Sequence, residues 1–145
     1  MNIIQILPSI LEESSGPSYS VRRLCEKISE KSNLELLTLS NKTFLQNKNI
    51  RNSKLNFHKE FDINYLPRRL GSSPNMKKYI KDKVSGNSVD IIHNHGMWQM
   101  TATYTTLAKK FENIKTINSP RGTLSPVALS HSRVKKNAFW LLFQI

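Results

Sequence analysis

The chain has 145 residues, about one domain's length, and its 38% hydrophobic and 22% charged residues are ordinary for a globular protein. Its 22 Lys and Arg residues against 10 Asp and Glu residues give a formal net charge of +12, which favours polyanionic partners: nucleic acid, anionic lipid or phosphorylated substrates. The single cysteine, Cys25, excludes an internal disulfide and a multi-cysteine zinc site. We expect a cytoplasmic protein, since no signal peptide is evident and no stretch approaches the roughly 18 apolar residues of a membrane span.

The N-terminal part predicts a strand, a helix and a second strand. Residues 2–7 (NIIQIL) form a β-branched run that Pro8 ends, and residues 34–40 (LELLTLS) form another apolar run. Between them, apolar residues recur at helical spacing in residues 20–32 (SVRRLCEKISEKS). This βαβ order predicts that the two strands pair in parallel through a right-handed crossover.

The middle of the chain is less regular and rich in Asn and Lys. We expect a loop there with a short strand at residues 54–58 and a further strand at 61–67. A helix is predicted after them, because Ser73 suits the N-cap and Pro74 the first helical position. Gly86 is a suitable C-terminal stop for that helix.

The last part of the chain alternates strands and helices again. We expect a strand at 88–95 (SVDIIHNH), a helix at 99–112, a strand at 114–119 (IKTINS), a loop at 120–126 (PRGTLSP) and an uncapped helix at 135–145. The whole pattern predicts an α/β protein with a Rossmann-like open parallel sheet and flanking helices. In such sheets ligands bind at the carboxyl ends of the strands.

The segment HNHGMW follows one of these strand ends and contains two of the four histidines. His93 and His95 should point to the same face of the sheet, because residues two apart on a strand share a face. Three interpretations compete: a metal site, a sugar or phosphate site, or a strand end whose histidines contact only backbone and solvent. A zinc site needs a third ligand, and neither His58 nor His131 stands at a ligand-like spacing.

Two other loops stand at the same predicted edge. Gly16, in EESSGPSYS, precedes a helix whose N-terminal N–H groups could approach an anion. The three-glycine dinucleotide fingerprint and the Walker lysine are both lacking, and Pro17 removes one donor. Arg121 stands beside Gly122 after the last strand, where a guanidinium could bind phosphate or carboxylate, or could be an ordinary surface side chain.

Four segments, taken in order and spacing, resemble the N-terminal domain of bacterial family 4 glycosyltransferases, which have the GT-B architecture. They are NIIQILPSI, SSGPSYSVRRLCEKI, DIIHNHGMWQM and INSPRGTLSPVALSHSRVKKNAFW. Residues 41–60 add nothing to the resemblance. It implies a retaining glycosyltransferase of hexosyltransferase type, acting in surface polysaccharide biosynthesis. Such an enzyme moves a sugar from a nucleotide-sugar donor to a saccharide or polyprenyl-linked acceptor, without a metal or other cofactor.

The resemblance also implies roles for five residues. His95 would be the catalytic residue that contacts the transferred sugar, with His93 as the second choice. Gly16 would lie near the donor phosphates, although a serine replaces the paired glycine that many members carry before it. Arg121 and Gly122 would face the cleft and bind substrate.

We expect the His95 side chain to lie over the cleft, since Gly96 lets the backbone turn away after it. Trp98 is expected to pack beneath this loop, with a face offered to the sugar ring as the alternative. Residues 1–145 would be an incomplete N-terminal, acceptor-side half of the GT-B fold, because GT-B enzymes have a second Rossmann-like domain that holds most of the nucleotide-sugar site. As a truncated piece or part of a split enzyme, the chain alone would be inactive.

The alternative function is a non-catalytic basic module that binds nucleic acid or an anionic membrane surface. The basic residues are scattered, and the aromatic and basic pattern of the RNA-recognition sheet is lacking, so we expect no specific nucleic-acid partner. Peripheral contact with the inner face of the membrane is a further expectation. It rests on one basic segment, made of Arg68, Arg69, Lys77, Lys78, Lys81 and Lys83.

Overall fold

Five parallel strands form one sheet in the computed structural model of the chain. The structure describes residues 1–10, 16–40, 57–62, 72–131 and 133–143. The strands are β1 (Asn2–Leu7), β2 (Asn33–Ser40), β3 (His58–Asp62), β4 (Ile91–His95) and β5 (Lys115–Ser119). Their order is β3-β2-β1-β4-β5, and each neighbouring pair is parallel. The predicted Rossmann-like α/β sheet is therefore confirmed.

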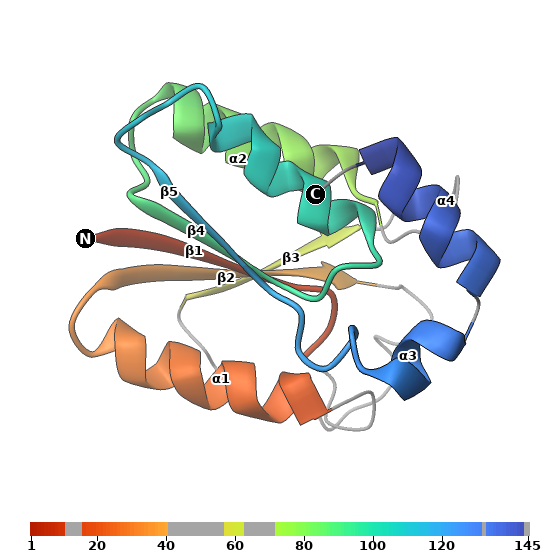
Figure 1. The fold of residues 1–145 in the computed structure, drawn as a ribbon. Coiled ribbons are helices and arrows are strands. Elements are labelled where there is room, and N and C mark those ends of the chain that lie inside the picture. The colour runs from red at the N-terminus through yellow and green to blue at the C-terminus, as the bar shows by residue number, and fades with distance from the viewer. Residues whose placement is uncertain (11–15, 41–56, 63–71, 132, 144–145) are drawn as a thin grey trace.

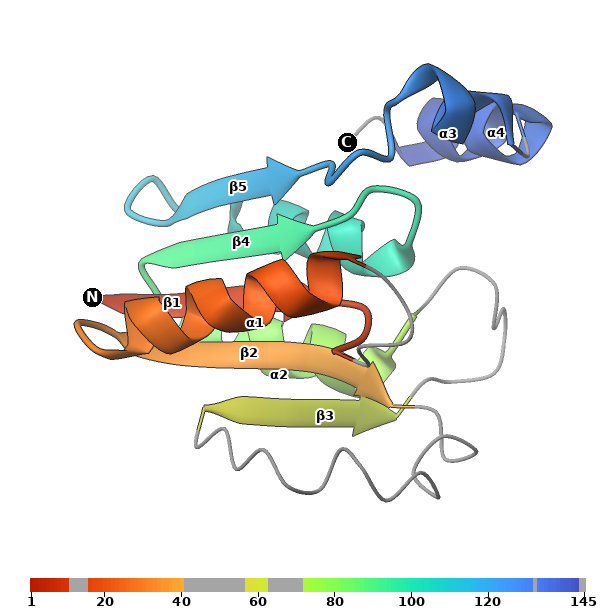
Figure 2. The ribbon, with the colours of Figure 1, turned by 90° about the horizontal axis from the view of Figure 1, so that it is seen from below.

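Helices cover both faces of this sheet (Figure 1). The elements are α1 (Gly16–Ser29), α2 (Pro74–Ser85), the 3-10 helix η3 (Met100–Ala108), α3 (Pro126–Ser130) and α4 (Arg133–Phe143). The first, α1, lies on one face, whereas α2 and η3 lie on the other. The last two, α3 and α4, lie beyond the carboxyl ends of the strands (Figure 2). Across the described ranges, every helix is too short or too polar to cross a membrane.

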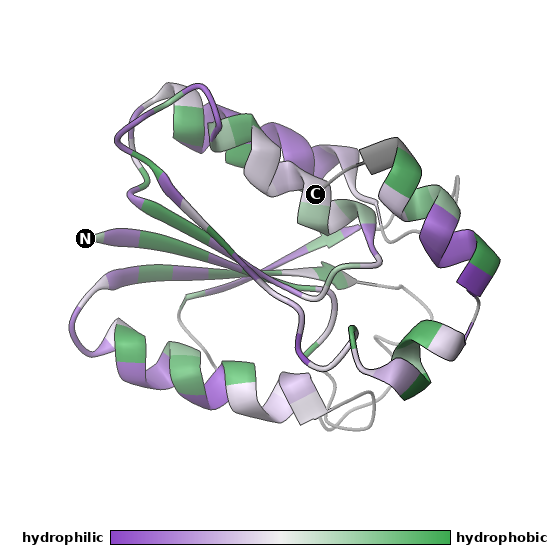
Figure 3. Ribbon diagram, viewed as in Figure 1, coloured by the Kyte–Doolittle hydropathy of each residue, from purple (hydrophilic) through white to green (hydrophobic). Residues whose placement is uncertain are grey.

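Alternate residues of the strands fill two separate cores, one on each face of the sheet. Because both faces are covered, the central strands are nearly continuous apolar runs rather than alternating ones. On one face, residues of β1, β2 and β4 pack against α2 and η3, and Ile6, Leu37 and Ile80 are fully buried there. On the other, Leu36 packs with Val21 of α1. Figure 3 shows the apolar stripe of α1 turned toward the sheet.

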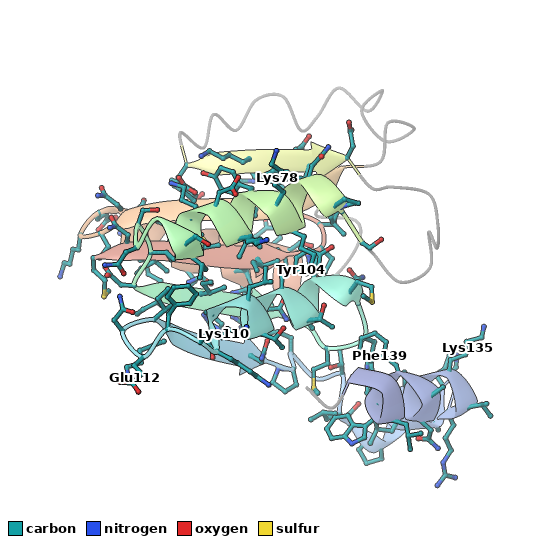
Figure 4. The ribbon with its side chains drawn as sticks, turned by 90° about the horizontal axis from the view of Figure 1, so that it is seen from above. Lys78, Tyr104, Lys110, Glu112, Lys135 and Phe139 are labelled. Atoms are coloured by element: carbon teal, nitrogen blue, oxygen red, sulfur yellow. The ribbon has the colours of Figure 1, made fainter. Side chains whose placement is uncertain are left out.

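The ends of α2 are those that the sequence predicts. Ser73 is the N-cap, and its hydroxyl accepts a hydrogen bond from the Met76 N–H at 3.3 Å. Gly86 ends the helix, with its N–H donating to the Asp82 carbonyl at 2.9 Å. The hydroxyl of Tyr104, which comes from η3 beside α2 (Figure 4), accepts from the backbone N–H of Ser73 at 2.8 Å. This bond connects the start of α2 to η3 through a buried contact.

The segment predicted as an α-helix at 99–112 is instead a 3-10 helix that ends at Ala108. Its threonines explain the difference, because β-branched side chains restrict helical rotamers and hydroxyls compete for backbone carbonyls. Thr103 donates to the Met100 carbonyl at 2.6 Å, and Thr105 donates to the Ala102 carbonyl at 2.9 Å. These bonds reach back three residues, which is the spacing of a 3-10 turn.

Strand β3 also differs from the prediction. The separate strands expected at 54–58 and 61–67 are wrong at their boundary, because His58–Asp62 is one continuous strand paired with β2. Parallel pairing with an apolar neighbour holds the polar HKEFD segment in the sheet although its own sequence is a weak strand signal. Of the rest of the two predicted ranges, Phe57 is in a turn, and 54–56 and 63–67 lie outside the described residues.

Candidate functional site

A polar cluster stands at the point where the strand order reverses. The chain runs from β1 outward to β2 and β3, then returns to the other side of β1 for β4 and β5. In open parallel sheets, ligands bind in the crevice at the carboxyl ends of the strands flanking this reversal. Those strands here are β1 and β4. Gln5 of β1 lies opposite His93 of β4, so the polar side chains of both strands meet across the switch point.

His95 stands at the centre of this cluster. Its Nε2 lies 2.7 Å from Gln5 Oε1, and its Nδ1 accepts a hydrogen bond from Arg121 Nε at 3.1 Å. A guanidinium can only donate, so Nδ1 carries no proton. The proton of the neutral ring must then be on Nε2, where it is donated to the Gln5 carbonyl oxygen. These two partners fix one tautomer of His95.

Burial and neighbouring charge keep His95 neutral. Its side chain is only 1% exposed. Burial, then the adjacent His93 and then the positive charge of Arg121 lower the pKa of His95 from 6.5 to about 3. At neutral pH the ring is therefore a hydrogen-bond acceptor for Arg121, and it has no second proton to give to a substrate.

The His95 side chain, expected over the cleft, is buried in the structure. The ring is enclosed because Gln5 and Arg121, which lie far from it in the sequence, cover its two nitrogen atoms. Gly96 does turn the backbone, with φ of +99°, as predicted. The turn redirects the chain after β4, whereas the side chain before it stays on the sheet face.

His93 is the more accessible of the two histidines. The rings lie on the same face of β4, as predicted, with their centroids 4.0 Å apart and their planes inclined by 46°. Nε2 of His93 lies 2.7 Å from the hydroxyl of Ser119, at the end of β5. Burial, followed by the positive charge of Arg121, lowers the pKa of His93. This ring is partly buried, and it is the histidine that a ligand can approach first.

Arg121 reaches His95 from a sharply turned loop. Its φ of +51° lies in the left-handed region, which is uncommon for a residue with a side chain, and Gly122 follows with φ of +77°. A Cβ added at Gly122 would meet nothing within 4 Å, so the backbone conformation rather than lack of space favours glycine there. The two left-handed residues turn the chain back after β5, and the arginine side chain returns to the switch point.

The loops after β4 and β5 are joined to each other. The Gly96 N–H donates to the Ser119 carbonyl at 2.8 Å, and the Trp98 indole N–H donates to the Thr123 carbonyl at 3.1 Å. The Trp98 ring also packs edge-on against Phe139 of α4, with their centroids 6.2 Å apart. Trp98 has the expected packing role, and it holds the loop that follows His95 against the loop bearing Arg121.

The predicted site residue Gly16 is not part of this cluster's hydrogen bonds. It is the exposed first residue of α1, and a Cβ added there would meet nothing within 4 Å. The described contact near it is that of the Ser18 hydroxyl, which donates to the Ser9 carbonyl at 3.0 Å and joins α1 to the segment after β1. The other residues of this loop, 11–15, lie outside the described residues, and so do both glutamates of EESSGPSYS.

Two polar residues of the site, Gln5 and Ser119, were not predicted from the sequence. Gln5 is the sole polar residue within the apolar run IIQIL, and a polar side chain in a buried strand is a recognisable signal of a partner across the sheet. Ser119 had no such signal. Asn94 stands between the two histidines, so it is on the opposite face of the sheet, where it is fully buried and its Nδ2 donates to the Gly96 carbonyl at 2.7 Å. Among the described residues, its Oδ1 has no hydrogen-bond partner.

Among the described residues, no three His, Cys, Asp or Glu side chains gather closely enough to hold a metal ion. His58 lies across the sheet in β3, where its Nε2 is 2.8 Å from the Thr38 hydroxyl. His131 is an exposed residue at the end of α3. Neither of these histidines approaches His93 and His95 as a third ligand.

The basic segment expected to face a membrane is only partly available for that role. Lys83 turns to Glu35, with Nζ 3.0 Å from Oε1, and Lys59 contacts the same carboxylate at 3.1 Å. Both ammonium groups also lie over the Tyr79 ring. Lys83 must therefore be removed from the predicted basic surface. Lys77, Lys78 and Lys81 are exposed on α2, whereas Arg68 and Arg69 lie outside the described residues.

Comparisons of the chain with protein-family models, with curated proteins and with solved structures find no match. The strand order and the place of the cluster favour a ligand bound at the carboxyl edge of β1 and β4. Among the described residues, the cluster's hydrogen-bond partners include an arginine and no carboxylate, which favours an anion there.

Proposed function

We propose that this chain is the acceptor-side, N-terminal domain of a retaining glycosyltransferase of GT-B architecture. One observation carries the proposal: a buried neutral histidine holds an arginine at the switch point of a Rossmann-like sheet. A nucleotide-sugar donor leaves a diphosphate when its sugar is transferred. A preorganised positive group at that position stabilises the developing negative charge, and such electrostatic stabilisation is commonly the largest catalytic contribution.

In this proposal Arg121 binds the departing diphosphate. The guanidinium has five N–H donors, and His95 takes the one on Nε. The four on the terminal nitrogens suit a phosphate, which accepts paired hydrogen bonds. The left-handed turn at Arg121 and Gly122 supports the same role, because such sparsely populated backbone conformations are concentrated at functional sites.

The geometry favours different roles for the two histidines from those that the family resemblance implies. His95, the expected catalytic residue, is better suited to position Arg121, since sugar contact through its Nδ1 requires Arg121 to leave that atom. His93 is more accessible, and its ring can exchange the Ser119 hydroxyl for a sugar hydroxyl. The reaction expected from the family is attack by the acceptor hydroxyl on the face from which the diphosphate departs. We propose no metal or cofactor for this reaction.

The rest of the proposed site involves parts beyond the cluster. The N-terminus of α1, which begins at Gly16, carries a partial positive charge that suits the donor phosphates. A second Rossmann-like domain would hold most of the nucleotide-sugar, and the acceptor would be a saccharide or a polyprenyl-linked saccharide. We propose that the protein works in the cytoplasm at the inner face of the membrane, in surface polysaccharide assembly.

The test is transfer activity of the chain joined to a nucleotide-sugar-binding GT-B domain. Incorporation of labelled sugar from UDP-, GDP- and dTDP-sugars into lipid-linked saccharides is measured for Arg121→Ala and His95→Ala. Arg121→Ala should reduce turnover by about 100-fold or more, the effect of removing one preorganised donor from developing charge. His131→Ala, a histidine outside the cluster, is the matched control. Full turnover of Arg121→Ala, or an equal loss in the control, contradicts the proposal.

A second candidate function, a basic module that binds an anionic membrane, is favoured by the three exposed lysines of α2. Each basic residue near an anionic surface contributes roughly 1 kcal/mol of attraction. The triple variant Lys77→Gln, Lys78→Gln and Lys81→Gln should then lose cosedimentation with phosphatidylglycerol vesicles. Lys83→Gln should keep it, because this lysine already pairs with Glu35. Equal binding to neutral vesicles would rule out this electrostatic version.

A further inference from the structure

A groove of about 650 Å³ lies beside the loop after β4 that contains Trp98, here called the Trp98 loop, and is bounded by α3 and α4. Trp98 forms one side and Trp140 of α4 another, with their ring centroids 6.3 Å apart. The volume is in the usual range for small-molecule sites. The hydrogen bond from Trp98 to Thr123 joins the loop that follows His95 to the loop that bears Arg121, so the groove lies next to the candidate site.

The walls of the groove combine aromatic, cationic and amide groups. Arg133, Lys136 and Asn137 of α4 contribute the cationic and amide groups, and none of the described lining residues is a carboxylate. Lys136 lies over the Trp98 ring, with its Nζ 5.6 Å from the centroid, and donates to the Ala128 carbonyl. Its ammonium is therefore held at the wall between α3 and α4, where it makes the groove electropositive.

Trp140 gives the groove an accessible aromatic surface. Its side chain is 48% exposed, although Phe139 beside it is buried against the Trp98 loop. In Figure 4, α4 stands apart from the sheet, with Lys135 pointing away from the rest of the molecule. An indole ring offers a flat apolar face, which suits the C–H face of a sugar ring, while arginine and asparagine suit its charged and hydroxyl groups.

We propose that this groove binds an anionic saccharide. A carboxylate or phosphate of the saccharide is bound by Arg133 and attracted by Lys136, a sugar ring lies on Trp140, and Asn137 contacts hydroxyl groups. As an acceptor site the groove rests on the proposed glycosyltransferase function, and it then specifies a negatively charged acceptor. Binding of the saccharide itself needs no transfer reaction, so it can be measured even if the proposed activity is absent.

The two tryptophans make the groove directly observable. The sequence contains two tryptophans, and both line this groove, so intrinsic fluorescence reports on it selectively. The probes are a tetrasaccharide of alternating glucuronate and N-acetylglucosamine, glucose 6-phosphate, and a neutral N-acetylglucosamine tetrasaccharide. A saturable fluorescence change with the glucuronate tetrasaccharide or with glucose 6-phosphate supports the proposal, and the stronger of the two identifies the acidic group. Equal affinity for the neutral tetrasaccharide overturns it.

A pair of charge-matched variants separates a built site from general attraction. Arg133→Ala should weaken binding of the glucuronate tetrasaccharide by about tenfold or more, because a charge-assisted hydrogen bond is lost. Lys135→Ala removes the same charge two residues away, outside the groove lining, and should change the affinity less than about twofold. Both positions are exposed, so both variants should fold, which circular dichroism checks. Equal losses in the two variants overturn the proposal.

An anionic membrane is the competing occupant of this face. Val127, Val134 and Leu141 are 79%, 82% and 78% exposed, and Figure 3 shows apolar residues on both α3 and α4. Helices with apolar and basic residues of this kind can lie at a membrane interface. A blue shift of the tryptophan emission with phosphatidylglycerol vesicles, without saturable binding of either anionic sugar probe, would overturn the saccharide proposal.

Discussion

His95 should make the chain less stable as the solution becomes mildly acidic. In the folded chain the pKa of His95 is lowered from 6.5 to about 3 by burial, by His93 and by Arg121. In the unfolded chain the ring returns to its ordinary pKa. Between these two values the unfolded chain binds a proton that the folded chain does not bind. Lowering the pH therefore favours unfolding, and the stability that His95 contributes is complete above about pH 6.5 and falls toward pH 3.

The size of the effect follows from the two pKa values. At pH 5, protonation of the unfolded ring lowers the free energy of unfolding by about 2 kcal/mol relative to pH 7.5, by proton linkage. The ring is 1% exposed, so solvent does not screen its environment. This is a large part of the roughly 5–15 kcal/mol that stabilises a typical domain. His93 and His58, whose pKa values are also lowered, add to the loss in the same direction.

The assay is urea unfolding at pH 7.5 and pH 5, followed by circular dichroism. The free energy of unfolding should fall by about 2 kcal/mol less between pH 7.5 and pH 5 in His95→Gln than in the wild type, because the glutamine side chain does not titrate. The exposed His131 provides the matched control, and His131→Gln should keep the wild-type difference. An independent readout is the ¹⁵N spectrum of the imidazoles, in which His95 should remain a neutral Nε2–H tautomer at pH 5. A wild-type difference retained in His95→Gln, or a protonated His95 at pH 5, would refute the reasoning.

Three further predictions concern other parts of the fold. Ser73→Ala removes the N-cap hydroxyl that Met76 uses and should cost about 1 kcal/mol in urea unfolding, whereas Ser72→Ala should cost less than half as much. Gly96→Ala should lower the free energy of unfolding by about 1–2 kcal/mol, because the φ of +99° strains any residue with a Cβ. An unchanged midpoint of urea unfolding would contradict this. Cys25 is buried, and burial raises the pKa of its thiol to about 12, so a disulfide reagent should modify it in urea and not in buffer.

The sequence predicts a helix or strand correctly where its local pattern and its tertiary packing favour the same structure. The strand at residues 2–7 and the cap at Ser73 were found because an apolar run and a capping residue act locally. The threonine-rich segment that forms a 3-10 helix has the pattern of an α-helix, since spacings of three and four residues share one apolar face and only the hydroxyl bonds distinguish the two helices. Strand β3 depends on pairing with β2 rather than on its own residues, so its bounds were wrong.

In the candidate site, too, the features set by local sequence were predictable and those set by tertiary contacts were not. Period-two geometry predicted that His93 and His95 share a face, and the positions of Arg121 and Gly122 at a strand end followed from the element order. Which histidine is buried could not be predicted. Burial of His95 depends on Gln5, 90 residues away, and on Arg121, 26 residues away, and both contacts arise only when β1, β4 and β5 are assembled side by side.

Two locally unfavourable features meet at this one edge of the sheet. Arg121 has a left-handed backbone, and His95 is an ionisable group held neutral by burial. Each of these costs stability, and a scaffold selected for stability alone has little reason to concentrate them at its switch point. A ligand bound by Arg121, as we propose, would explain their common position. Anion binding should therefore be lost in Arg121→Ala. If this variant binds anions as well as the wild type does, the cluster has only a structural role.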